Sequence, residues 1–173
     1  MPDYCFDDIY AITPEFLVSL GVKLVLLDID NTLVPYEEPL PTAPVLKWLA
    51  GLDEKGIAAA FISNNERERV ETFNRDLQYY ASWKSKKPSV RYYREAMEKT
   101  GVGKEGTAVI GDQIFTDVWS AKRLGVPALL VKPIRDKKTL LFRFKRALEK
   151  PILRRFRRRE EKEAARREEG KKL

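Results

Sequence analysis

Five short apolar runs alternate with helix-like segments along the first 131 residues. A continuous apolar run is typical of a strand buried on both faces, and a helix between successive strands is typical of a parallel sheet with crossover connections. The expected strands are residues 22–27, 57–62, 77–81, 107–110 and 128–131. The pattern therefore predicts an α/β fold, a doubly wound, mostly parallel five-stranded sheet of the Rossmann-like class.

Helix-starting and helix-ending residues separate the expected strands. Thr13 followed by Pro14 is typical of an N-cap and a first helical position, and Gly21 closes that short helix. Further helices are expected over residues 44–55, 66–76, 89–99 and 114–124. The length of 173 residues predicts one domain, over 1–150, followed by a basic, charged tail over 151–173.

The chain contains no histidine and one cysteine, Cys5, and this composition excludes several kinds of site. A Ser-His triad, a zinc site built on His or Cys, and an intrachain disulfide cannot be assembled. Any catalysis must therefore use carboxylates, lysine and hydroxyl groups, with or without a hard metal ion. The acidic N-terminus does not resemble a secretory signal, and no apolar stretch reaches the roughly 18 residues of a membrane-spanning helix. A cytoplasmic protein, or one peripheral on the inner face of the membrane, is expected.

Polar residues capable of chemistry follow each expected strand. Ligands of open parallel sheets bind beyond the carboxyl ends of the strands, so these residues should converge on one edge. At these places the sequence has Asp28-Ile29-Asp30-Asn31-Thr32, Ser63-Asn64-Asn65, Lys86-Lys87-Pro88, Gly111-Asp112-Gln113 with Thr116-Asp117, and Lys132-Pro133.

Carboxylates gathered at one edge repel one another and are costly to keep ionised without a cation. A magnesium ion with open water positions suits such oxygen ligands, and the site would then attract a phosphate dianion. Asp28 is placed to attack phosphorus as a nucleophile. Asp30 can protonate the leaving oxygen and later accept a proton from water. Lys87 and Ser63 can hold the remaining phosphate oxygens.

Taken in order, these groups resemble the motifs of the haloacid dehalogenase superfamily of phosphatases. The residues that match are Asp28 to Thr32 for Asp-x-Asp-x-Thr, Ser63 for the hydroxyl after strand two, Lys87 (with Lys86 as a rival) for the Lys near a Pro, and Gly111, Asp112 and Asp117 for Gly-Asp-x4-Asp. The ordered set is far more specific than Asp-x-Asp alone.

By this resemblance Asp28 is the nucleophile and Asp30 the acid/base, as the residues themselves suggest. The resemblance also implies that magnesium binds Asp28, the Asp30 carbonyl and Asp112, and that Asp117 orients the site. Only 32 residues separate Asp30 from Ser63 and 23 separate Ser63 from Lys87, which leaves no room for a separate cap domain.

The capless pattern Asp-Ile-Asp-Asn-Thr-Leu-Val, with Ser-Asn-Asn and Gly-Asp-Gln-x2-Thr-Asp, is similar to the YqeG family of subclass IIIA. That family is similar to the mitochondrial phosphatidylglycerophosphate phosphatases. The resemblance implies a phospholipid phosphate monoester, phosphatidylglycerophosphate, as the substrate, in phospholipid biosynthesis. An uncapped site suits such a large or surface-bound substrate.

Some of these residues also have ordinary structural interpretations. Ser63 can cap the following helix, and Asp117 can be a helix-surface acid. Asn31 and Asn64 can contact phosphate as substrate-binding residues or serve as turn residues.

The activity has two rival interpretations. One is a phosphatase acting on a sugar phosphate, a nucleotide or a phosphoprotein. The other is a nucleic-acid-binding module with a degenerate enzyme body, binding through its basic tail. The complete set of Asp28, Asp30 and Asp112 disfavours the second, since binding alone would not need it.

Positive charge is concentrated toward the C-terminus. Residues 132–173 hold 18 Lys and Arg against 7 Asp and Glu, a net charge of +11, whereas residues 1–131 have a net charge of −4. Apolar residues recur among these cations at helical spacing, namely Leu141, Phe144, Leu148, Ile152 and Phe156. Such a segment can lie on an anionic membrane surface, pack on the body of the protein or bind nucleic acid.

Overall fold

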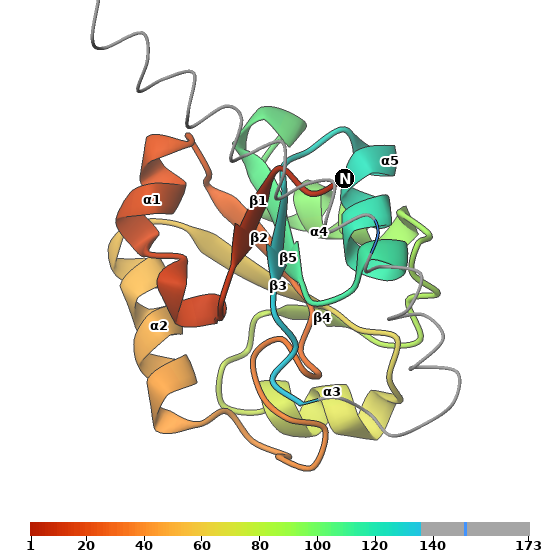
Figure 1. Ribbon diagram of the computed structural model, residues 1–173. Coiled ribbons are helices and arrows are strands. Elements are labelled where there is room, and N and C mark those ends of the chain that lie inside the picture. The colour runs from red at the N-terminus through yellow and green to blue at the C-terminus, as the bar shows by residue number, and fades with distance from the viewer. Residues whose placement is uncertain (136–150, 152–173) are drawn as a thin grey trace, which may run out of the picture. The chain divides into compact units, whose positions relative to one another are not determined.

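The computed structural model describes residues 1–135 and residue 151. One compact unit extends from Pro2 to Arg135 and is built on a single parallel sheet (Figure 1). Among the described residues the sheet has six strands in the order β1-β6-β5-β2-β3-β4. This order confirms the doubly wound α/β fold. It places β2 (Leu24–Leu27) at the centre, between β3 (Ala58–Ile62) and β5 (Thr107–Gly111).

The sheet has one strand more than the five predicted. β1 (Tyr4–Phe6) pairs in parallel with β6 (Ala128–Val131), with Tyr4 opposite Leu129. This three-residue edge strand has no continuous apolar run, because Cys5 points to solvent while its two neighbours are partly buried. Its pairing depends on a strand near the other end of the unit, so local sequence does not reveal it.

The remaining elements lie close to their predicted positions. β4 (Tyr80–Ser82) forms the other edge of the sheet. The helices are α1 (Pro14–Ser19), α2 (Ala43–Glu54), α3 (Arg67–Asn74), α4 (Arg91–Thr100) and α5 (Trp119–Leu124), with short turns η1 (Ile9–Ala11) and η2 (Lys104–Gly106). The predicted helix 114–124 begins as a π-helical turn, η3 (Ile114–Val118), a form that is often found at functional sites.

Helices cover both faces of the sheet. Figure 1 shows α1 and α2 on one side and α4 and α5 on the other. α3 packs against the same apolar cluster as α2, through Val70 and Phe73, and the Phe73 ring meets that of Phe61 edge-on at 5.4 Å. α1 begins as predicted, with the Thr13 hydroxyl accepting a hydrogen bond from the Phe16 N–H at 3.2 Å.

The connections between the motif residues are short. Between Asp30 and Ser63 the chain forms one loop, α2 and β3, and between Ser63 and Lys87 it forms α3, β4 and their loops. Neither interval of this described part contains a separate cap domain. The predicted apolar stripe of the tail and the predicted boundary at residue 150 lie outside the described residues. Over the described part of the chain, no helix is long and apolar enough to cross a membrane.

Candidate active site

The strand order brings the predicted carboxylates together at the centre of the sheet. Asp28 follows β2 and Asp112 follows the adjacent β5, where the connections leave in opposite directions and where open α/β sheets bind ligands. The Asp28 N–H continues the ladder by donating to the Ile110 carbonyl at 3.0 Å. Asp28, Asp112 and Asp117 are all buried, and each has a carboxylate oxygen within 4.8 Å of the others.

Of the two candidate lysines, Lys87 is the one that lies among these carboxylates. Its Nζ is 2.5 Å from Asp28 Oδ1 and 2.7 Å from Asp117 Oδ1, and its side chain is 3% exposed. Lys86 is exposed, with a left-handed backbone (φ 54°). Adjacent residues in this loop point in different directions, so only Lys87 reaches the site.

Burial and the neighbouring charges together shift the pKa values of Asp28 and Lys87. Burial raises the pKa of Asp28 to about 7, a rise that Lys87 opposes and Asp117 reinforces. Burial alone would lower the pKa of Lys87, but the charges of Asp117 and Asp28 outweigh it and raise that pKa above its usual value. Lys87 is therefore cationic. A further positive charge beside Asp28 would favour the ionised carboxylate that attack on phosphorus requires.

The backbone of the last motif fixes Asp117. One of its oxygens accepts from Lys87, and the other, Oδ2, accepts from the Gln113 N–H and the Thr116 hydroxyl, both at 3.2 Å. A Cβ on Gly111 would lie 2.3 Å from Asp117 Cγ, so the motif needs glycine at this position. Both oxygens of Asp117 are engaged by protein groups, which fits the predicted orienting role better than the alternative of a surface acid.

The residues present fit a divalent cation. Three buried carboxylates share one lysine, which leaves an excess of negative charge that burial makes costly. Asp28 and Asp112, which follow the adjacent central strands β2 and β5, are the side chains that would hold the ion. Hard carboxylate oxygens suit magnesium, which keeps several water ligands.

Asp30 lies apart from the cluster and is held by two other side chains. Its Oδ1 accepts from Arg69 Nε and its Oδ2 from Asn65 Nδ2, each at 3.0 Å. Neither Arg69 nor Asn65 was identified from the sequence. Asn65 belongs to the Ser63-Asn64-Asn65 motif, which was the available signal, whereas Arg69 resembles every other cation of a charged helix.

Ser63 and Asn64 occupy the turn after β3. The buried Ser63 Oγ accepts from the Asn65 N–H at 3.0 Å, while the N-cap position of α3 belongs to Glu66, so Ser63 does not cap that helix. The Asn64 side-chain oxygen accepts from the Lys87 N–H at 2.7 Å. Asn64 thus holds the backbone of the lysine loop against the Ser63 turn.

Asn31, for which both phosphate contact and a turn role were predicted, occupies a buried turn, and its contact with substrate stays a prediction. It is fully buried and has a left-handed backbone (φ 70°), which Asn tolerates better than most residues. Its amide nitrogen donates to Arg135 O at 2.7 Å and lies 3.4 Å from Asp112 Oδ2, and its oxygen accepts from the Arg135 N–H at 2.8 Å. These contacts support the alternative of a turn residue and also tie the end of β6 to the carboxylate cluster.

Two further side chains lie near the site, and neither was assigned a role from the sequence. The Thr32 hydroxyl donates to Asp28 Oδ2 at 3.1 Å and so helps to fix the rotation of that carboxylate. Tyr36 is partly buried, and burial together with the charges of Asp112, Asp28 and Asp30 raises the pKa of its phenol, which remains protonated. Thr32 was available from the motif, whereas Tyr36 had no local signal.

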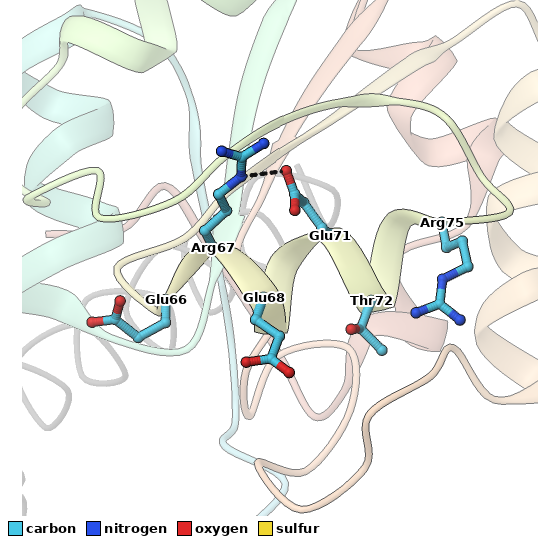
Figure 2. A pocket seen from close by; sticks show the side chains of 6 residues that line it. All are labelled: Glu66, Arg67, Glu68, Glu71, Thr72 and Arg75. Atoms are coloured by element: carbon cyan, nitrogen blue, oxygen red, sulfur yellow. Dashed lines mark hydrogen bonds and ion pairs between the residues drawn. The ribbon is translucent and has the colours of Figure 1, made fainter.

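A shallow surface pocket lies on α3, away from these carboxylates. Figure 2 shows its lining along the outer side of the helix, with Arg67 paired to Glu71 at 2.6 Å. The lining residues are Glu66, Arg67, Glu68, Glu71, Thr72 and Arg75. It contains no motif residue, and its side chains are mostly charged groups of both signs in solvent, so the chemistry belongs to the strand ends.

The fold and the strand-end cluster together define a Rossmann-like α/β protein with an acidic site at the carboxyl edge of its sheet. The chain belongs to the haloacid dehalogenase-like hydrolase family, which matches residues 36–131. That match begins after the Asp28 motif and includes Ser63, Lys87, Asp112 and Asp117.

Within this family the chain is similar to a curated phosphatase. It is 35% identical over 153 residues to "Probable phosphatase YqeG" of Bacillus subtilis, covering 88% of this chain and 89% of that protein. The chain is thus a phosphatase of the haloacid dehalogenase superfamily, and the predicted similarity to YqeG is confirmed.

Solved structures share the fold. A hypothetical protein from Xanthomonas campestris aligns with a TM-score of 0.53 and 18% identity, over 75% of this chain and 74% of that chain. A 4-nitrophenylphosphatase from Thermotoga maritima aligns with a TM-score of 0.50 and 15% identity, over 70% and 90%. The cobalt-bound form of a deoxy-D-mannose-octulosonate 8-phosphate phosphatase from Haemophilus influenzae has a TM-score of 0.50 and 16% identity, over 66% and 80%.

Proposed function

We propose that this phosphatase hydrolyses phosphate monoesters through a covalent aspartyl phosphate on Asp28, with magnesium as the cation. The observation that carries the proposal is the setting of Asp28. It follows the central strand, is contacted on one oxygen by Lys87 and on the other by Thr32, and stands two residues before a second carboxylate. A carboxylate fixed in this way is an oriented nucleophile.

Two displacements at phosphorus complete the reaction. In the first, an Asp28 oxygen forms a bond to phosphorus while the bond from phosphorus to the ester oxygen breaks, and Asp30 gives a proton to that departing oxygen. In the second, water attacks the same phosphorus, its proton passes to Asp30, and the bond to Asp28 breaks. Inorganic phosphate leaves, and both carboxyl groups return to their starting states.

The other residues of the site would neutralise the negative charge of the phosphoryl group and hold its oxygens in place. Lys87 is cationic and lies next to Asp28, so it can hold a phosphoryl oxygen during both displacements. The buried hydroxyl of Ser63 can donate to another. Magnesium held by Asp28 and Asp112 would neutralise phosphoryl charge. The Asp30 carbonyl stays the third predicted ligand.

Phosphatidylglycerophosphate is the substrate we favour. The lack of a cap in the described intervals supports a site that a bulky or membrane-held phosphate ester can reach. Two exposed apolar residues belong to loops that contact the motif residues or their partners, and their side chains are compatible with an apolar substrate. Ile134 donates its N–H to the Asn31 carbonyl, and Leu40 follows Pro39, whose carbonyl binds Arg69.

A chromogenic phosphate ester tests the reaction. The wild-type chain should turn it over with magnesium, and Asp28→Asn should not. Acid quenching should trap ³²P from the substrate on the protein as an acyl phosphate, which alkali should hydrolyse and hydroxylamine should convert to a hydroxamate at Asp28. No turnover of any ester in a broad panel would refute the proposal.

A substrate panel tests the specificity and the role of the tail. Phosphatidylglycerophosphate in mixed micelles should be hydrolysed with a higher kcat/KM than sugar phosphates, nucleotides or phosphopeptides. Removal of residues 151–173 should spare the chromogenic ester but weaken cosedimentation with anionic vesicles, as should added salt, since charges are screened beyond about 8 Å at physiological ionic strength. Salt-sensitive binding to RNA without binding to vesicles would contradict the membrane role.

A further inference from the structure

A single guanidinium group connects the acid/base residue to the loop beside it. Arg69, on α3, donates from Nε to Asp30 Oδ1 at 3.0 Å and from Nη1 to the Pro39 carbonyl at 2.8 Å. Its Nη2 also lies 3.0 Å from Asp30 Oδ1. The Arg69 side chain is 14% exposed and the Asp30 side chain 7% exposed, so this pair is shielded from solvent far more than an ordinary surface ion pair.

The contacts on Asp30 fix the rotation of its carboxylate. Arg69 approaches Oδ1 and Asn65 approaches Oδ2, each through one hydrogen bond of 3.0 Å. Oδ2 has one lone-pair position left, which in the protonated carboxyl group can carry the proton given to the ester oxygen and in the carboxylate can accept a hydrogen bond from water. Without Arg69, Asp30 would keep only the Asn65 contact and could rotate about its χ angles.

The position of Arg69 is itself determined by packing. Its guanidinium lies 5.5 Å from the centre of the Phe73 ring one turn further along α3, and Phe73 is buried against Phe61 of β3. Val70, next to Arg69, is also fully buried. The helix is therefore anchored to the sheet beside the arginine, which gives the guanidinium a defined place.

We infer that Arg69 is a positioning residue that sets the geometry of proton transfer by Asp30 and fixes the loop of residues 35–42 next to it. The inference rests on the proposed function, since it assigns to Asp30 the transfer of a proton to the ester oxygen. Arg69 does not contact the reacting atoms in this assignment. It acts through the carboxylate that it holds.

A comparison of leaving groups tests the inference. An ester whose leaving group needs no proton, 2,4-dinitrophenyl phosphate, is compared with an alkyl phosphate whose leaving oxygen must be protonated. Arg69→Gln should lower kcat/KM for the alkyl ester on the order of 100-fold, the cost of a misplaced catalytic group, and should change kcat/KM for the dinitrophenyl ester little. The comparison uses kcat/KM because the second displacement, in which Asp30 accepts a proton from water, is common to both esters and affects kcat alone.

Two controls separate positioning from a structural role. Arg75→Gln removes an exposed arginine at the end of the same helix and should leave both esters unaffected. In an Asp30→Asn background, Arg69→Gln should have no further effect on alkyl ester hydrolysis, because the residue through which it acts is gone. Arg69→Lys serves in the same assays if thermal unfolding shows that the Gln variant does not fold.

The outcomes distinguish this inference from the proposed function. Equal losses of kcat/KM on both esters, or a further loss in the Asp30→Asn background, would assign Arg69 a structural role and overturn the inference. Unchanged alkyl ester turnover in Arg69→Gln would also overturn it while leaving the proposed function intact. Failure of the wild-type chain to hydrolyse either ester would remove the reaction itself, and the inference with it.

Discussion

Two ion pairs of nearly equal length show how differently charge is used in this molecule. Lys87 and Asp117 are 2.7 Å apart with side chains 3% and 2% exposed, whereas Arg67 and Glu71 on α3 are 2.6 Å apart with side chains 67% and 51% exposed. Water screens the second pair and lets each partner stand alone. Water cannot replace Lys87 in the first pair, because removal of Lys87 would leave Asp117 buried without an opposite charge.

The buried cluster also has fewer cations for its carboxylates than the surface of α3 in Figure 2, where three glutamates lie with two arginines. Asp28, Asp112 and Asp117 face one lysine, and burial together with Asp117 resists the ionised form of Asp28. Such an arrangement is a poor way to stabilise a fold, and it is explained by a reaction that needs a cation and a nucleophile in one place. The comparison therefore predicts that function and stability will respond separately to changes in the cluster.

The largest expected effect is on turnover in Asp28→Asn. Loss of the nucleophile should lower kcat by about 10⁴-fold or more, as removal of a group central to covalent catalysis does in other hydrolases. The fold should persist, because the change removes one of three mutually repelling carboxylates. Turnover of a chromogenic ester and denaturant unfolding measure the two quantities. Retention of a tenth of wild-type activity would rule out the covalent route.

Removal of the metal should have the next largest effect. Turnover is expected to vanish in excess chelator, to return with magnesium and to be suppressed by calcium, which prefers more ligands and a looser geometry. The measurement is the steady-state rate after dialysis against chelator and titration with each ion. Full activity in chelator would show that Lys87 alone balances the cluster.

Replacement of Lys87 by Met should destabilise the fold. In chelator the free energy of unfolding should fall by about 3–5 kcal/mol, the usual cost of breaking a buried ion pair from one side. Magnesium should restore part of this loss, because it supplies positive charge to the same carboxylates. Denaturant unfolding with and without the ion measures both values, and a loss below about 1 kcal/mol would place the pair with ordinary surface pairs.

The smallest effect is expected at the exposed pair. Glu71→Gln should change the free energy of unfolding by about 0.5 kcal/mol or less, since Arg67 and Glu71 form an exposed pair four residues apart on a helix. Turnover should be unchanged. A loss of unfolding free energy comparable to that of Lys87→Met would mean that solvent exposure does not determine how much an ion pair stabilises this fold.

The difference between buried central strands and a half-exposed edge strand explains which parts of the fold could be predicted from the sequence. The central strands carry unbroken apolar runs, and the residues after them follow a known order, so the sequence alone locates Asp28, Asp112 and the site edge. It does not reveal β1, because a half-exposed edge strand of three residues has no such run. The π-helical turn that carries Asp117 resembles, in sequence, the beginning of an ordinary helix.

Contacts between distant segments are not encoded in any local pattern. Lys86 and Lys87 are chemically identical neighbours, and only the loop conformation directs Lys87 to Asp28 while Lys86 faces solvent. The contacts of Asn31 are hidden from the sequence for the same reason. Nothing local indicates that its amide would be buried against Arg135.

The sequence by itself determined the sheet, the edge at which chemistry occurs and the residue types available there. This follows because apolar periodicity defines parallel strands, and the carboxyl ends of parallel strands meet at one edge. The tertiary structure decided how each carboxylate is held, including the contact of Arg69 with Asp30 across 39 positions of sequence. That contact depends on how Val70 and Phe73 seat α3 against the sheet, a packing outcome that involves residues far apart in the chain.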